Sequence, residues 1–181
     1  MNVYQLFFES EPDGNCKYRH FGPLDSCHPE ILRAARLEWF RGKTMSNEWH
    51  PLEIEPGEGT EHLELPDFDA TPLWHMFSHR AVDALADILE PNGELLPVIY
   101  PECEYYAYNC LTLADVVDSE KCDPIYDNFR KLIFRKDALD GLTIFVMKDC
   151  PWVDLLVTDT FVERVKQSNL KGFGFIKRPT V

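Results

Sequence analysis

Two stretches of this sequence, 80 residues apart, follow the same order of strand, helix cap, helix, turn and strand. In the first, "FSHRAVDALADILEPNGELLPVIYP", Ser78 is the expected N-cap, and a strand is expected from Leu95 to Tyr100 after the "PNG" turn. In the second, "VTDTFVERVKQSNLKGFGFIK", Thr158 is the expected cap and Gly172 the turn before a strand that reaches Ile176. An amphipathic helix must bury its apolar stripe, so both stretches predict a helix packed on a sheet.

The match between the two stretches extends to individual positions. At the offset of 80 residues the aligned pairs are Ser78 with Thr158, Val82 with Val162, Asp83 with Glu163 and Leu85 with Val165. Two copies are too few for a solenoid. The pattern fits a duplicated strand–helix–strand unit and equally a chance similarity between two ordinary amphipathic helices.

Further elements fill the rest of the chain. "VYQLFFES", Val3 to Ser10, reads as a strand, and "DSCHPEILRAARLEWFRG" as a helix that stops at Gly42. "YYAYNCLTL", "KLIFRK" and "LTIFVMKD" are strand candidates, with Gly141 turning the last two into a hairpin. We expect a single α+β domain over residues 1–181, with a mixed or mostly antiparallel sheet covered by two or three helices.

The segment between Lys43 and Arg80 contains eight acidic residues and no lysine or arginine. It is interrupted by four prolines and two glycines, which exclude a long helix and leave short strands such as "PLEIE" joined by loops. The chain has a formal net charge of −13, and residues 1–90, with 17 acids against 7 bases, carry −10 of it. Such a surface repels nucleic acids and anionic lipids and attracts cationic partners. Direct nucleic-acid binding is therefore not expected.

The sequence also suggests a compartment. No apolar run reaches the 18 or more residues of a membrane span, and "MNVYQLFFESEPDG" lacks the features of a signal peptide. The six cysteines are scattered without a CxxC pair. We expect a cytoplasmic protein, without membrane association, whose cysteines are reduced.

Metal sites find little support in the residue spacing. "HPE" at residues 28–30 resembles half of a zinc deaminase motif, but the required PCxxC is absent. Cys16, His20, Cys27 and His28 are suitable zinc ligands by type, yet no C-x(2–4)-C or H-x(3–5)-H spacing occurs among them. We expect no metal and no cofactor.

Signatures of catalysis are equally weak. "GFGF" at residues 172–175 follows a helix instead of leading into one, so it is not a phosphate loop. Asp67 and Asp69 form one of many acidic pairs and are better explained by a solvated face than by acid–base chemistry. We expect a protein that is not an enzyme.

Residues 73–177 contain three packing motifs that carry a resemblance to a known family. They are "FSHRAVDAL", the "VVD" of Val116 to Asp118 with the polar turn after it, and the closing "VTDTFVERVKQSNLKGFGF". In this order they resemble immunity family eleven of bacterial polymorphic toxin systems. Residues 1–72, the acidic amino-terminal part, match more loosely, and the acid-rich segment does not align. The resemblance implies an antidote that binds and silences a cognate toxin domain, and it supplies no catalytic residue to transfer.

Charge and resemblance together lead to one hypothesis about the acidic segment. An inhibitor of a toxin that acts on nucleic acid must occupy a cationic cleft, and a row of carboxylates can imitate the displaced phosphates. The expected partner is therefore a basic toxin domain. Carboxylates would steer the encounter and aromatic residues would anchor it. The predicted partner-binding residues are Glu53, Glu55, Glu58, Glu61, Glu64, Asp67 and Asp69, with Trp49, Phe68 and Trp74 as anchors.

Three alternatives stay open on the sequence alone. The acidic segment is a mobile, solvated loop that keeps the protein soluble, or the protein is a general interaction module without a toxin partner. The third is a small-molecule or metal-using enzyme with a pocket between the two similar units, near His75, His79, Asp67 and Asp69.

Overall fold

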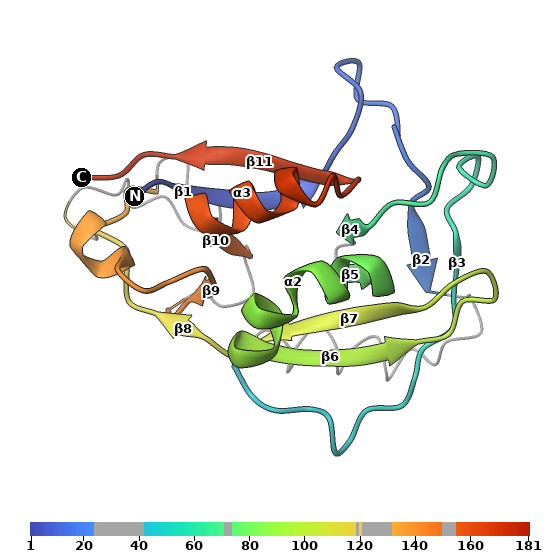
Figure 1. Ribbon diagram of the computed structural model, residues 1–181, viewed down its shortest axis with the longest axis horizontal. Coiled ribbons are helices and arrows are strands. Elements are labelled where there is room, and N and C mark those ends of the chain that lie inside the picture. Colours follow the sequence, from blue (N-terminus) through green and yellow to red (C-terminus); the bar gives the residue numbers. More distant parts are fainter. Residues whose placement is uncertain (24–41, 71–73, 119, 121–131, 150–154) are drawn as a thin grey trace.

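The computed structural model describes residues 1–23, 42–70, 74–118, 120, 132–149 and 155–181. These residues form an α+β fold with three sheets and two α-helices, as the sequence predicts (Figure 1). The five-stranded sheet has the order β11 (Phe173–Arg178), β1 (Val3–Phe8), β10 (Leu156–Thr158), β9 (Ile144–Met147) and β8 (Leu113–Ala114). The four-stranded sheet has the order β4 (Phe68–Ala70), β5 (His75–Ser78), β7 (Tyr105–Cys110) and β6 (Gly93–Val98). A ribbon of β2 (Phe21–Pro23) and β3 (Ile54–Pro56) completes the set.

The two similar stretches of sequence have the same topology. Helix α2 (His79–Asn92) connects β5 to β6, and both strands pair antiparallel with β7, which lies between them. Helix α3 (Asp159–Gln167) connects β10 to β11, and both strands pair antiparallel with β1 in the same way. In each unit the helix therefore crosses between two parallel strands that are separated by one antiparallel strand.

Local signals in the sequence set the ends of these helices. Ser78 is the N-cap of α2, and its hydroxyl accepts a hydrogen bond from the backbone N–H of Ala81 at 3.1 Å. Thr158 occupies the N-cap of α3, but its hydroxyl donates to the carbonyl of Leu142 at 2.8 Å instead of capping the helix. Helix α2 also runs further than the "PNG" turn predicts. It continues through Pro91 because the side-chain amide of Asn92 donates to the carbonyl of Ile88 at 2.8 Å and so satisfies the last turn.

Apolar side chains fill three layers. The central core lies between the two large sheets and contains the apolar faces of both helices, including Leu85 and Phe161, which are fully buried. The outer face of the four-stranded sheet packs beneath the β2–β3 ribbon, and the outer face of the five-stranded sheet forms a third cluster around Phe134. Successive residues of one strand serve different layers, as Met76 and Phe77 of β5 do.

Two expected elements differ from the structure or lie outside it. "KLIFRK" is not a strand where it is described: Phe134 makes only isolated bridges to Val117 and Thr180, and a 3₁₀ helix, η2 (Lys136–Leu139), follows. The predicted hairpin at Gly141 is therefore wrong, and β9 pairs with β10 and β8 instead. The helix expected before Gly42 lies almost entirely outside the described residues.

Two further observations concern the cysteines and the helices. Cys16, Cys103 and Cys110 carry free thiols, whereas the other three cysteines lie outside the described residues. Within the described part of the chain, neither helix combines the length and apolarity needed to cross a membrane.

Candidate partner-binding surface

The acidic segment contains an ordered turn, residues 57–64, which we call the acidic turn. The N–H of Gly57 donates to the carbonyl of His20 at 2.7 Å, and the N–H of Thr60 donates to the carbonyl of Gly57 at 3.0 Å. The Thr60 hydroxyl also donates to Gly57, at 2.7 Å, and its side chain is buried. The N–H of Leu63 closes the next turn on Thr60 at 3.0 Å. Because these bonds fix the backbone, Glu58 and Glu61 project to solvent from a defined frame.

Arg19 joins the acidic turn to a second acidic loop. Its backbone N–H donates to the carbonyl of Glu64 at 2.9 Å, and its guanidinium donates to the carbonyl of Glu61 at 2.6 Å. The same guanidinium donates to the hydroxyl of Tyr100 at 2.7 Å and to the carboxylate of Glu102 at 2.8 Å. The Tyr100 hydroxyl and Arg19 both hydrogen-bond to Glu102 and hold the pKa of this carboxyl below its usual range. The Arg19 side chain is mostly buried, so it holds the two loops together and adds little positive surface.

A histidine–aspartate pair fixes the other side of the acidic turn. The Nδ1 atom of His20 lies 2.7 Å from the Asp69 carboxylate, and the N–H of Phe21 donates to the other Asp69 oxygen at 2.9 Å. The hydrogen bond to Asp69 raises the pKa of His20. Asp69 is fully buried, so its carboxylate stabilises the start of β2 and is not accessible to a partner.

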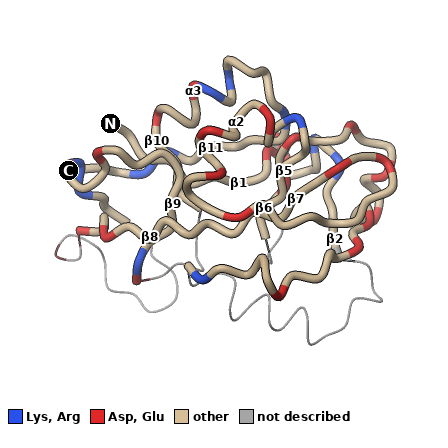
Figure 2. The backbone as a smooth tube through the Cα atoms, turned by 60° about the horizontal axis from the view of Figure 1, so that its bottom comes forward, with Lys and Arg blue, Asp and Glu red and all other residues tan. Residues whose placement is uncertain are grey.

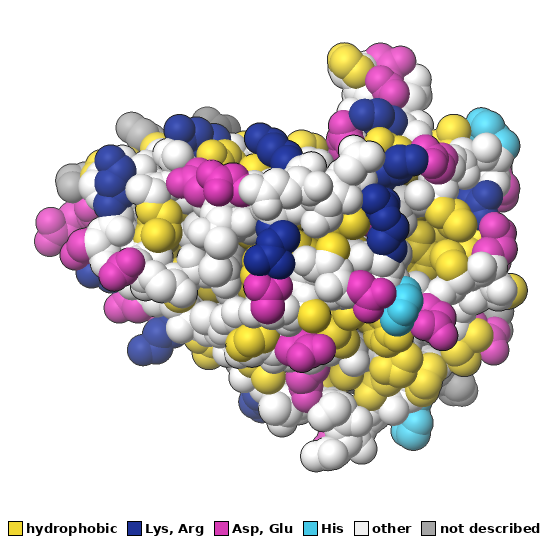
Figure 3. Space-filling view, in the orientation of Figure 1, with side chains coloured by type: hydrophobic (Ala, Val, Ile, Leu, Met, Phe, Trp, Pro, Cys, Tyr) yellow, Lys and Arg dark blue, Asp and Glu magenta, His cyan; other side chains and the backbone are white. Residues whose placement is uncertain are grey.

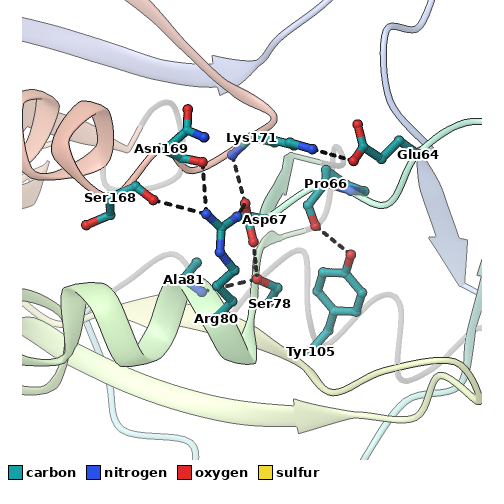
Figure 4. Close-up of polar contacts among 10 residues, drawn as sticks. All are labelled: Glu64, Pro66, Asp67, Ser78, Arg80, Ala81, Tyr105, Ser168, Asn169 and Lys171. Carbon is teal, nitrogen blue, oxygen red and sulfur yellow. Dashed lines mark hydrogen bonds and ion pairs between the residues drawn. The ribbon is translucent and has the colours of Figure 1, made fainter.

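Asp67 connects the two strand–helix–strand units (Figure 4). Its carboxylate accepts hydrogen bonds from the Ser78 hydroxyl at 2.9 Å, from the Arg80 guanidinium at 2.6 Å and from the backbone N–H of Lys171 at 2.8 Å. Arg80 also donates to the carbonyls of Ser168 and Asn169, each at 3.0 Å, at the end of α3. Asp67 therefore ties the N-terminus of α2 to the loop after α3. It belongs to the scaffold of the fold.

Of the ten predicted partner-binding residues, five glutamates remain accessible. Glu53, Glu58, Glu61 and Glu64 are exposed and Glu55 is half-buried, while Lys171 forms an ion pair with Glu64. We call these five, together with Glu102, the acidic end. Figure 2 shows acidic residues gathered at the end of the molecule near β2.

The other predicted residues correct the sequence interpretation. Phe68 is completely buried and stacks on Phe173, with 4.8 Å between ring centroids. Trp74 is also buried, in the cluster beneath the β2–β3 ribbon. Trp49 is half-buried, and its indole N–H donates to the carbonyl of Pro97 at 2.7 Å. Neither Phe68 nor Trp74 can anchor a partner, and the buried carboxylates Asp67 and Asp69 cannot contact one.

A metal centre is the other kind of functional site to which the described residues could contribute. In those parts of the chain, no group of three His, Cys, Asp or Glu residues is placed to hold a metal ion. His20 is engaged with Asp69, and Cys16 is exposed; Cys27 and His28 lie outside the described residues. His75 stacks on Phe68 at 6.0 Å, and desolvation lowers its pKa to about 4, so it is neutral at pH 7.

Sequence reasoning missed Arg19 and Glu102. Both lie far from the acidic segment along the chain, and no local pattern marks either as its neighbour. Comparison of the sequence with protein-family models finds no match, and comparison with curated proteins finds none either.

Proposed function

We propose that this protein is an inhibitor that binds a basic partner protein through the acidic end, as an immunity protein binds its toxin. The observation that carries the proposal is the acidic turn, which Arg19 anchors and from which Glu58 and Glu61 project to solvent. The resemblance to an immunity family supports the same direction.

The anchoring of the turn argues against a loop that only keeps the protein soluble. Solubility requires charge but no fixed geometry, so a solvating loop gains nothing from the buried Thr60 and the mostly buried Arg19 that anchor this turn. An interface does gain from them, because a backbone ordered before binding loses less conformational entropy when the partner docks. Carboxylates carried on an ordered backbone also resemble the row of phosphates of a nucleic acid, which a cationic cleft recognises.

Rescue of growth tests the proposal directly. The chain is co-expressed with the toxic domain encoded by the neighbouring gene, and growth of the host is scored. Wild-type protein should rescue growth, and the double variant Glu58→Lys/Glu61→Lys should not. The matched control is Asp137→Lys/Asp140→Lys, which makes the same change in net charge at exposed positions around η2, at the far end of the molecule (Figure 1). Equal rescue by both variants would refute the acidic end as the binding surface. Failure of the wild type to rescue growth would refute this toxic domain as the partner.

Association kinetics provide a second test. Electrostatic steering predicts that the association rate falls as salt rises, with a weaker salt dependence for Glu58→Lys/Glu61→Lys than for the control variant. Stopped-flow or surface plasmon resonance at roughly 50 to 500 mM salt, a range over which the Debye length falls from about 14 to 4 Å, measures this difference. If both variants keep the wild-type salt slope, the acidic end does not steer the encounter.

A further inference from the structure

An apolar patch on the four-stranded sheet lies beside the acidic end. Pro97 of β6 and Tyr106 of β7 are register partners, and their side chains lie on the sheet face that α2 covers. Leu95, two residues before Pro97, points to the same face and packs against the central core. Pro97 is exposed, whereas Leu95 and Tyr106 are half-buried. Figure 3 shows hydrophobic side chains gathered over β6 and β7 on this face.

The first turn of α2 borders this patch. The ring of His79 lies 6.4 Å from the ring of Tyr106. Val82 follows His79 by three residues and Asp83 by four, so both lie on the same side of the helix as His79. Val82 is half-buried against the central core. We call Val82, Leu95, Pro97 and Tyr106 the β6–β7 patch.

Carboxylates line the border of the patch. His79 lies 3.5 Å from the carboxylate of Asp83 and 3.5 Å from that of Glu104, and the two acidic side chains are 68% and 72% exposed. Desolvation raises the pKa of Tyr106, and the charge of Glu104, a hydrogen bond to Glu104 and the charge of Asp83 raise it further. Glu104 directly precedes β7 and lies two residues after Glu102, so this loop connects the acidic end to the patch.

We propose that the β6–β7 patch is the apolar anchor of the interface and receives one large apolar or aromatic side chain flanked by arginine or lysine in the partner. The apolar surface matches the anchor, and the carboxylates of Asp83 and Glu104 match the flanking cations. The ring of Tyr106 offers a further contact to an arginine by a cation–π interaction. The role that the sequence assigned to Phe68 and Trp74 is thereby moved to the surface of β6 and β7.

The choice of a basic, aromatic partner rests on the proposed function. The test uses peptides and does not need the toxin itself. Two blocked tripeptides, Arg-Trp-Arg and Glu-Trp-Glu, are titrated into ¹⁵N-labelled protein and followed by NMR. We expect Arg-Trp-Arg to shift the amides of Leu95, Leu96 and Tyr106, and to bind at least about tenfold more tightly than Glu-Trp-Glu. Shifts confined to another surface, or equal binding of the two peptides, would overturn the proposal.

Variants separate the apolar and the charged contributions. Tyr106→Ala should weaken Arg-Trp-Arg binding about fivefold or more. Asp83→Asn/Glu104→Gln, at two exposed positions with little effect on folding, should remove most of the preference between the peptides. Ile176→Ala on β11, where the side chain is 43% exposed, is the control and should bind as the wild type does. Unchanged binding by both test variants would refute the assignment.

The two proposals can fail separately. If the peptide binds at the patch but co-expression does not rescue growth, the patch is a binding site and the proposed toxin is not its partner. If the variants Tyr106→Ala and Asp83→Asn/Glu104→Gln still rescue growth, the protein is an inhibitor but the β6–β7 patch is not part of its interface.

Discussion

Replacing Asp67 with alanine should destabilise the protein by about 3 kcal/mol. The carboxylate accepts three hydrogen bonds and its side chain is only 9% exposed. Hydrogen bonds to a buried charged group contribute roughly 1.5–3 kcal/mol each, which sets the scale for the bonds from Ser78 and Lys171. Arg80 is 53% exposed, so solvent screening limits its ion pair to less than about 1 kcal/mol. Relaxation of the site and entry of water lower the sum toward the stated value.

Urea unfolding measures this change. With a slope of about 2 kcal/mol per M, the midpoint should fall by about 1.5 M for Asp67→Ala, and by about half as much for Asp67→Asn, which keeps one accepting oxygen. The exposed Glu58→Ala is the control and should stay within about 0.5 kcal/mol of the wild type. Amide exchange at Lys171 should also accelerate in Asp67→Ala, because its N–H loses its acceptor. A midpoint shift below about 0.3 M, which is under about 0.6 kcal/mol, would refute the view that Asp67 holds the two units together.

Three further predictions concern single residues. Gly172→Ala should destabilise the protein by more than about 2 kcal/mol, because φ is 87° and a Cβ would clash with the carbonyl of Phe68, the first residue of β4. Gly14→Ala is the control: φ is 84° but the space around it is open, so the change should cost about 1 kcal/mol. Thermal unfolding compares the two variants, and equal losses of stability would contradict the clash. Asp69 raises the pKa of His20, so the stability that this ion pair gives the folded protein is complete below pH ~6.5 and declines as the pH rises through the folded-state pKa. The difference in unfolding free energy between wild type and His20→Gln should therefore shrink from about pH 6 to about pH 8.5. A difference that stays constant over this range would contradict the role of the pair. Tyr105→Phe should cost about 1–2 kcal/mol in urea unfolding, because the buried phenol donates to a backbone carbonyl at 2.6 Å; a neutral substitution would show that water replaces the bond.

Some local signals in the sequence predicted the fold correctly. The cap at Ser78 and the turn at Gly172 depend on a few neighbouring residues, and both stand in the structure as the sequence predicts. The composition of the segment around Phe134 is typical of a strand. Leu132 and Phe134 are buried in the third cluster, and Phe134 makes isolated bridges to Val117 and Thr180, so the segment has the burial and part of the pairing of a strand without a continuous ladder.

The candidate site was less predictable because its contacts are not local. Asp67 and Asp69 look like their acidic neighbours in the sequence, but their donors come from residues 80 and 171 and from residues 20 and 21. Phe68 lies between them in a strand and therefore points to the opposite side, into the core. The alternation of acidic and apolar residues in "PDFDA" was the one sequence signal that distinguished Asp67 and Asp69 from the exposed glutamates before them.

The position of β1 has a consequence for biosynthesis. This strand precedes all the other strands in the sequence, yet both of its neighbours, β10 and β11, lie within residues 156–178. The strands of the four-stranded sheet, by contrast, all lie within residues 68–110 and have only short-range pairings. A ribosome-bound chain can therefore assemble the sheet with β6 and β7 early, while β1 stays unpaired until β10 and β11 have been made. Since β1 displays "VYQLFF" during that interval, this segment is the expected point of chaperone contact and of aggregation in chains truncated before β10.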